Sequence, residues 1–240
     1  TALTAHPIVG RLLSTIVFVT NGGNLTLNAP TLNAVAGSDL AVTATGSLTL
    51  PGSSINTLAG NLSLRSTGSS LSTAATLGTT SGTLSLSGKT GLNVQHALQT
   101  GSGPIDLATT TSGDVVVSAT ITSTSGALTV NARDAVSLSA PVNTGSGAIT
   151  LNANTDGTGA QGFTQAVGAT LTTSNAGAGA VSIGVNTSAG GTGGAVLDGI
   201  TVGSGGTISV RTNTGGNATG GSITQAAGSL LDAGTGTVSL

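Results

Sequence analysis

The side chains that could carry acid–base or metal chemistry in this chain are few and widely spaced. Two histidines, His6 and His96, stand 90 residues apart, and there is no cysteine to serve as nucleophile, disulfide partner or thiolate ligand. The acidic residues are seven aspartates, Asp39, Asp106, Asp114, Asp134, Asp156, Asp198 and Asp232. Because an active site needs converging groups of tuned pKa, we assign no catalytic, cofactor-binding or metal-ligating residue and predict a protein that is not an enzyme.

Two arrangements of aspartates come closest to a catalytic site. Asp106 and Asp114 would approach each other across a turn, and Arg133 directly precedes Asp134. Glycan-cleaving enzymes use paired carboxylates as acid and base, so glycan cleavage is a minor alternative. However, Asp39 follows Ser38 and Asp114 follows Gly113, and aspartate after such residues is common in ordinary turns.

Glycine-rich and threonine-rich stretches match known ion-binding, phosphate-binding and ice-binding patterns only in part. The stretch Gly190–Gly194 lacks both the aspartate of a calcium-binding nonapeptide and the Lys-Ser/Thr ending of a phosphate loop. Threonine pairs of the kind found on ice-binding faces occur at Thr43/Thr45, Thr120/Thr122, Thr212/Thr214 and Thr235/Thr237. They do not recur at one place in each repeat, so ice binding is also only a minor alternative.

The composition excludes several classes of protein. The 240 residues include 40 glycines, only 5% are charged, and the net charge is −2. Five lysines and arginines cannot form the basic face of a nucleic-acid binder. Disordered chains combine low hydrophobicity with high charge, whereas the mean hydropathy here is +0.37. The aliphatic residues alternate with Thr, Ser and Asn, which predicts short half-buried strands.

The N-terminal segment is the most apolar part of the chain. The run Ile8–Val19 is shorter than the ~20 residues of a membrane span and is interrupted by Arg11, so we predict no membrane insertion. We expect residues 1–20 to form a cap or a docking strand. The start at Thr1 and the end on a strand at Leu240 suggest a piece of a longer protein.

A repeat of about 22 residues dominates the rest of the chain. Its unit is Gly, any residue, apolar, polar, apolar, and its first apolar residues are Leu40, Leu62, Leu84, Ile105, Leu128 and Ile149. A second strand begins about eight residues later, as at Leu48 and Val136. We expect regular coils over 21–158 and coils with longer Gly-rich turns over 159–240, where Phe163–Gly168 is repeated at Ile223–Gly228.

Such units cannot bury their apolar faces alone, but stacked copies can. The repeat therefore predicts an all-β right-handed parallel β-helix of about eleven coils, a rod roughly 50 Å long at ~4.8 Å per coil. The repeated Gly and Asn are expected at turns that need positive φ. A sandwich of antiparallel strands is the competing fold, but sandwiches show a weaker period and usually a buried Trp or Tyr.

The phrases Gly126–Ala132, Gly147–Ala153 and Ile223–Leu230 resemble the repeat region of filamentous-haemagglutinin-like proteins, the large secreted surface proteins of bacteria. The resemblance covers nearly the whole chain after residue 20. It implies export, a β-helix shaft and roles in adhesion, whereas the Asn-Pro-Asn motif of that family's secretion domain is missing.

From the repeat and this resemblance we expect a non-enzymatic extracellular shaft segment of a surface or filament protein. It would need no cofactor, and its partners would be surface glycans or further copies of itself. The alternative is a fibre or sheath subunit that stacks end to end through open solenoid edges.

Overall fold

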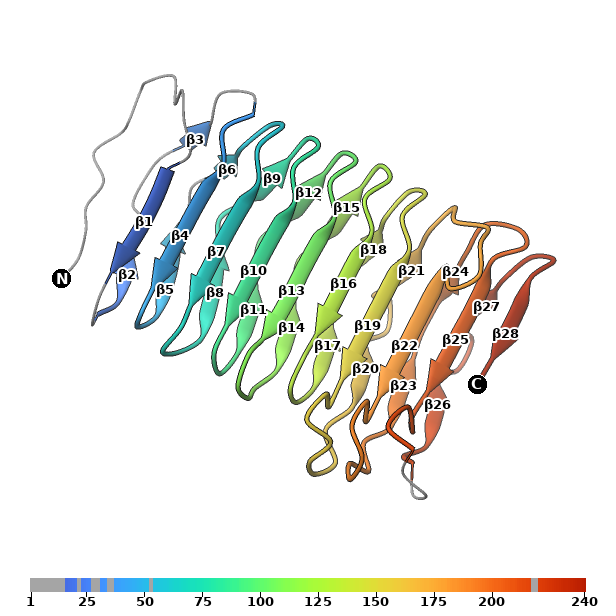
Figure 1. Ribbon diagram of the computed structural model, residues 1–240. Coiled ribbons are helices and arrows are strands. Elements are labelled where there is room, and N and C mark those ends of the chain that lie inside the picture. The colour runs from blue at the N-terminus through green and yellow to red at the C-terminus, as the bar shows by residue number, and fades with distance from the viewer. Residues whose placement is uncertain (1–15, 21–22, 27–30, 34–36, 52–53, 217–219) are drawn as a thin grey trace.

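A computed structural model describes most of the chain (Figure 1). The described residues are 16–20, 23–26, 31–33, 37–51, 54–216 and 220–240. They form 28 strands and no helix. Each strand pairs in parallel with the strand three places earlier or later, as β10 (Leu84–Gly88) does with β7 (Leu62–Ser66) and β13 (Ile105–Thr109). Three consecutive strands therefore make one coil and contribute to three different sheets.

We call the three sheets A, B and C, in the order in which the chain enters them. Sheet A has ten strands, β1 (Ile16–Thr20), β4 (Leu40–Ala44), β7, β10, β13, β16 (Leu128–Asn131), β19 (Ile149–Ala153), β22 (Val181–Val185), β25 (Thr207–Arg211) and β28 (Thr237–Ser239). Sheet B has nine, β2 (Leu25–Thr26), β5 (Leu48–Pro51), β8 (Leu71–Ala74), β11 (Leu92–Val94), β14 (Val115–Val117), β17 (Val136–Leu138), β20 (Phe163–Gln165), β23 (Ala195–Leu197) and β26 (Ile223–Gln225). Sheet C also has nine, β3 (Thr31–Asn33), β6 (Ser54–Asn56), β9 (Leu77–Thr79), β12 (Leu98–Thr100), β15 (Ile121–Ser123), β18 (Val142–Asn143), β21 (Leu171–Thr172), β24 (Ile200–Thr201) and β27 (Leu231–Asp232).

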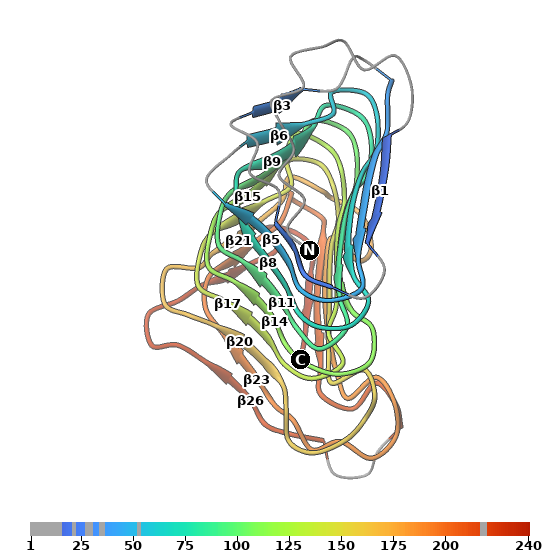
Figure 2. The same cartoon turned by 90° about the vertical axis from the view of Figure 1, so that its left-hand side faces the viewer.

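The coils wind as a right-handed solenoid. Seen from the N-terminal end, the chain runs down sheet A, crosses to sheet B and returns through sheet C while it recedes from the viewer (Figure 2). Sheet A forms one side of the cross-section, and sheets B and C together form the other. The prediction of a right-handed parallel β-helix is confirmed.

The predicted number of coils, about eleven, is too high. The described strands make nine complete coils, and β28 begins a tenth. The reason is that the last coils are longer than 22 residues. Ile149, Val181, Ile208 and Val238 stack in one row although they stand 32, 27 and 30 residues apart. At ~4.8 Å per coil the described rod is roughly 45 Å long.

The additional residues lie mainly at one corner, where the chain passes from sheet A to sheet B. This turn spans residues 132–135 between β16 and β17, but 154–162 and 186–194 in the two coils that follow, and in the last complete coil it includes the described residues 212–216 and 220–222. The loops 154–162 and 186–194 project from the lower edge of the rod (Figure 1). Residues 1–15 of the expected N-terminal cap lie outside the described residues. The last five residues of that segment form β1, which pairs in register with β4.

The core consists of aliphatic rows that run along the rod. In β10, Leu84 and Leu86 are fully buried while Ser85 and Ser87 are partly exposed, and β13 and β19 alternate in the same way. Because the pairing register is constant, the inner side chains of each coil pack on those of the next. Complete burial of one such side chain contributes about 1.5–3 kcal/mol, so the core grows coil by coil.

In the regular coils, the glycine that opens the sheet A repeat is needed for space and not for positive φ. A Cβ at Gly82, Gly103 or Gly126 would lie 1.8–1.9 Å from the carbonyl oxygen of the glycine one coil earlier. None of these three glycines has a positive φ. The expectation that the repeated glycines adopt positive φ is therefore wrong for these coils, where glycine permits the close approach of neighbouring coils. Gly179, which opens the repeat of β22, does adopt a positive φ of 77°.

Replacing one glycine of this row should destabilise the rod. In Gly126→Ala the new methyl group would meet the Gly103 carbonyl oxygen at 1.9 Å, so the coils would have to separate. Overpacking of this kind costs about 1–3 kcal/mol, which should lower the midpoint of urea unfolding.

A matched control is Gly91→Ala. Gly91 also lacks a positive φ, but its nearest neighbour would be the Ser70 Cβ at 3.6 Å, an ordinary contact. Its unfolding midpoint should stay equal or rise slightly, because alanine restricts the unfolded chain. Equal loss of stability in both variants would contradict the steric explanation.

Candidate functional site

Six of the seven aspartates hold turns in place. Each accepts a hydrogen bond from a backbone N–H, and four of these bonds join neighbouring coils. The donors are Asn61 N to Asp39 (2.7 Å), Ala135 N to Asp114 (2.9 Å), Gly113 N to Asp134 (2.6 Å), Thr158 N to Asp156 (3.0 Å), Gly168 N to Asp198 (2.7 Å) and Gly234 N to Asp232 (2.8 Å). These carboxylates stabilise the backbone where the strands end.

Asp106 is the exception. It lies on the outer face of β13, between the buried Ile105 and Leu107, and stacks between Ser85 and Thr129 of the neighbouring coils. Its carboxylate accepts no hydrogen bond from the described residues. Burial beside the neighbouring strands removes water from the carboxylate and raises its pKa above the ordinary value of 3.8.

The raised pKa of Asp106 predicts a pH-dependent stability. Below pH 3.8 the carboxyl is protonated in both the folded and the unfolded state. As the pH rises, the unfolded state ionises first, so the protein loses stability until the pH passes the folded-state pKa. Asp106→Asn should therefore match the wild-type melting temperature at pH 3 and exceed it at pH 7. A constant difference between pH 3 and pH 7 would contradict this assignment.

The structure places the members of the two acidic arrangements in different surroundings. Asp106 lies on the face of sheet A, whereas Asp114 lies in the following turn and bonds to Ala135. Arg133 donates its backbone N–H to Thr109 Oγ1 at 2.8 Å, and its guanidinium has no acceptor among the described residues. Asp134 instead accepts the backbone N–H of Gly113 in the turn one coil earlier. Within each of the two arrangements, the two residues therefore bond to different parts of the solenoid.

Of the two histidines, His96 lies within the described residues. His96 is exposed in the turn between β11 and β12, and His6 lies outside the described residues. Within the described ranges, no three His, Cys, Asp or Glu side chains gather to hold a metal ion. No helix suitable for crossing a membrane occurs in those ranges either.

The threonine pairs do not form one surface. Thr43 lies on β4 of sheet A and Thr122 on β15 of sheet C, while Thr212 and Thr214 follow β25. A different hydroxyl row does stack along the outside of sheet A. From β7 onward it consists of Ser63, Ser85, Asp106, Thr129, Thr150, Ser182, Ser209 and Ser239.

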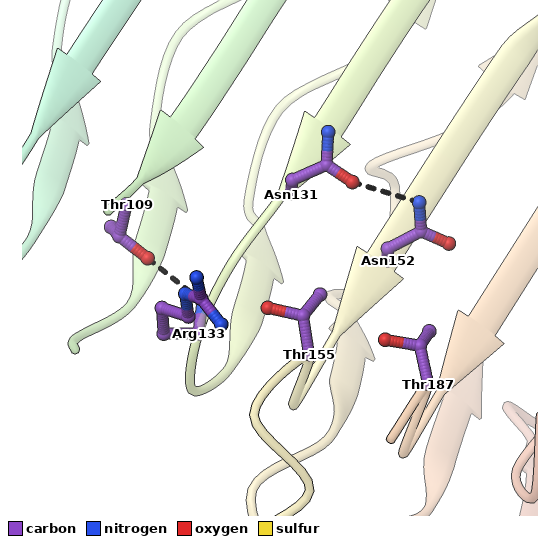
Figure 3. Close-up of a pocket in the computed structure, with 6 residues that line it drawn as sticks. All are labelled: Thr109, Asn131, Arg133, Asn152, Thr155 and Thr187. Atoms are coloured by element: carbon purple, nitrogen blue, oxygen red, sulfur yellow. Dashed lines mark hydrogen bonds between the residues drawn. The ribbon is translucent and has the colours of Figure 1, made fainter. Parts of the chain in front are cut away.

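A second outer row of sheet A runs beside the first, nearer the turn to sheet B. From β7 to β25 it consists of Arg65, Ser87, Ala108, Asn131, Asn152, Gly184 and Arg211. Asn152 Nδ2 donates to Asn131 Oδ1 at 2.9 Å, so two coils share an amide bond on the surface (Figure 3).

A shallow groove of about 420 Å³ lies at this edge of sheet A. Its polar lining combines hydroxyl groups, carboxamides and one guanidinium (Figure 3). The lining residues are Thr109, Asn131, Arg133, Asn152, Thr155 and Thr187. They come from three successive sheet A strands, β13, β16 and β19, and from the turns after β16, β19 and β22, so the stacking of coils creates the site.

The positive charges of the described chain gather at the same edge. Arg65 and Arg211 lie near the ends of β7 and β25, Lys89 directly follows β10, and Arg133 follows β16 by two residues. Arg11, the remaining cation, lies outside the described residues. The edge therefore carries cations whose successive separations in the sequence are 24, 44 and 78 residues.

The sequence analysis missed the polar groups inside the solenoid. Thr57 and Thr144 are fully buried after sheet C strands, and each hydroxyl donates to the carbonyl of the glycine three residues later. Asn154 and Asn186 are also fully buried, and Asn154 Nδ2 donates to Asn186 Oδ1 at 2.7 Å. The recurring Thr-x-x-Gly spacing is a signal that could have identified the first group.

No protein-family model, curated protein sequence or solved structure gives a significant match to this chain. The resemblance to filamentous-haemagglutinin-like repeats therefore stays a prediction.

Proposed function

We propose that this chain is a non-enzymatic structural and adhesive β-solenoid, a shaft segment of a large bacterial surface protein that is exported from the cell. The observation that carries the proposal is the in-register stacking of sheet A through ten strands. From β7 to β28 one outer row of this sheet carries Ser or Thr in every coil except at Asp106.

The mechanical part of the proposal rests on the direction of the backbone hydrogen bonds. In all three sheets they join one coil to the next, and so they run along the rod. Bending would stretch the bonds of one sheet while the others are compressed. A single core of aliphatic rows resists the same distortion, because packed interiors have low compressibility. These features suit a spacer that holds other parts at a distance from a surface.

The adhesive part rests on the chemistry of the outer faces. The rows on sheet A present hydroxyl and carboxamide groups, which both donate and accept hydrogen bonds. A flat array of such groups matches the hydroxyl-rich surface of a polysaccharide through many weak contacts. The resemblance in sequence adds the expectation of an extracellular location.

The proposal is tested by locating the protein and measuring attachment. Antibodies against the purified chain should label intact cells of the source organism, and the chain displayed on a non-adherent bacterium should increase attachment to polysaccharide-coated surfaces. Changing Thr129, Thr150 and Ser182 to alanine removes three stacked hydroxyls from the outer face and should lower that attachment severalfold.

The matched control places alanine at Thr122, Thr172 and Thr201 on the outside of sheet C, which should leave attachment unchanged. Labelling only after permeabilisation would contradict the proposed location. If bacteria that display the wild-type chain attach no better than bacteria without it, the adhesive role is contradicted.

A second candidate function, end-to-end stacking of copies, is favoured by Gln165 and its sequence counterpart Gln225. Gln165 Nε2 donates to Ala169 O in its own turn (2.8 Å) and to Gly199 O in the next coil (2.9 Å), and its Oε1 accepts the Asp198 N–H. Gln225 keeps the local bond, to Ser229 O at 2.8 Å. Its other amide hydrogen and its Oε1 have no partner among the described residues.

Apolar side chains lie exposed beside Gln225 at the same end of the rod. Val238 is 40% exposed and Leu240 is 63% exposed. If copies stack there, the purified protein should form rods longer than one chain in negative-stain micrographs and sediment faster as its concentration rises. Lysine at Val238 and Leu240 should abolish both effects, because stacking would bury the added charges.

Lysine at Val167 is the control, because this residue is 86% exposed in the turn that follows β20, on the side of the rod. That variant should assemble like the wild type. Single-chain rods at every concentration of the wild type would exclude stacking.

A further inference from the structure

We propose that the groove at the sheet A edge binds a sugar that carries a carboxylate, a uronate or a sialate, with Arg133 as the anion-binding residue. This inference rests on the proposed adhesive function and names the ligand class of one site on the shaft. The groove lies where Asn131, Asn152 and the turns after their strands meet (Figure 3).

Arg133 has a fixed backbone and an uncommitted side chain. Its N–H donates to Thr109 Oγ1 at 2.8 Å, and this hydroxyl in turn donates to Gly113 O at 2.9 Å. The guanidinium lines the groove and has no acceptor among the described residues. A planar guanidinium offers two parallel N–H groups, which match the two oxygens of a carboxylate.

The other groups of the groove suit the hydroxyls of a sugar ring. The bond between Asn131 and Asn152 uses one donor and one acceptor. It leaves the Asn131 Nδ2 donor and the Asn152 Oδ1 acceptor on the surface, beside the hydroxyls of Thr155 and Thr187. One cation among neutral donors and acceptors fits a hydroxylated monoanion, whereas a polyphosphate or nucleic acid would need several cations in contact.

A glycine makes room for the side chains at the groove. In the outer row Asn152 is followed by Gly184 of the next coil, which is buried. A Cβ at Gly184 would lie 3.0 Å from Asn152 Oδ1 and 3.4 Å from Thr187 Cγ2. Any larger side chain at this position would press on both residues, so glycine here allows Asn152 and Thr187 to hold their positions in the groove lining.

The nearby carboxylates of Asp134 and Asp156 form no ion pair with the guanidinium of Arg133. Asp134 bonds to Gly113 N, and Asp156 accepts both the N–H and the hydroxyl of Thr158. Arg65, Lys89 and Arg211 follow the same edge of sheet A. They add a positive potential along the rod that attracts an acidic polysaccharide without touching the sugar in the groove.

The test compares acidic and neutral sugars on two arginine variants. Trigalacturonate and 3′-sialyllactose represent the two sources of a sugar carboxylate, and the methyl ester of the first and lactose are their neutral partners. Binding to the purified chain is measured by isothermal titration calorimetry at low salt. At least one acid should bind more tightly than its neutral partner, and Arg133→Gln should weaken that binding about tenfold, the value of a charge-assisted hydrogen bond.

Arg65→Gln is the matched control, since it also removes one positive charge from this edge of sheet A, but outside the groove. It should leave the affinity nearly unchanged. A second variant, Asn131→Ala, tests the groove at an exposed position without a change of charge and should also weaken binding. Circular dichroism verifies that each variant is folded.

Three results would overturn the inference. These are the absence of binding by both acids, equal binding of acids and neutral partners, and equal losses in Arg133→Gln and Arg65→Gln, which would indicate diffuse attraction. Surface labelling and polysaccharide attachment are measured separately. If they persist while the acids fail to bind, only the ligand class is wrong, and the proposed function stands.

Discussion

Parallel pairing of each coil with the next is the constraint on which the structure depends. It places equivalent residues of neighbouring coils ~4.8 Å apart along the whole rod, on the inside, the outside and the turns. A residue is therefore tolerated only if copies of its kind can stack. Leucine, valine and isoleucine satisfy this inside, and serine, threonine and asparagine satisfy it outside. Stacked like charges repel, which accounts for a chain with only 5% charged residues.

The same spacing explains features that composition alone leaves obscure. Gly126 is glycine because the Gly103 carbonyl of the coil before lies where a Cβ would be, and not because the turn needs an unusual backbone angle. Thr144 is buried because its hydroxyl satisfies a carbonyl at the turn into sheet A. Asn154 and Asn186 pair inside the corner where the long loops begin, so that buried amides are bonded to each other and to the backbone.

The surfaces for which we propose binding differ in how closely they follow this uniform stacking. Along sheet A the outer rows are repetitive and suited to weak contacts over a large area. At the edge beside the turn to sheet B the repeat varies: two asparagines are followed by a glycine, and an arginine lies in the neighbouring turn. The groove appears where these exceptions meet. A regular shaft and a specific site are thus compatible within one solenoid.

The sequence by itself determined the class of fold, the inward and outward residues of the regular coils, and the position of most sheet A strands. It could do so because the register of Leu62, Leu84 and Ile105 follows directly from a spacing near 22. The number of coils was not accessible in this way, since loops of unequal length separate Val181 from Ile149 without disturbing their stacking.

Only the tertiary structure decided which turn residues lie together. The distance along the chain between Thr109, Arg133 and Thr187 has no fixed relation to their distance in space, because the winding brings every third strand to the same side. It likewise decided that the aspartates bond to backbone N–H groups of neighbouring turns. A hydrogen-bonding partner one coil away is set by the register of the coils, which local sequence does not contain.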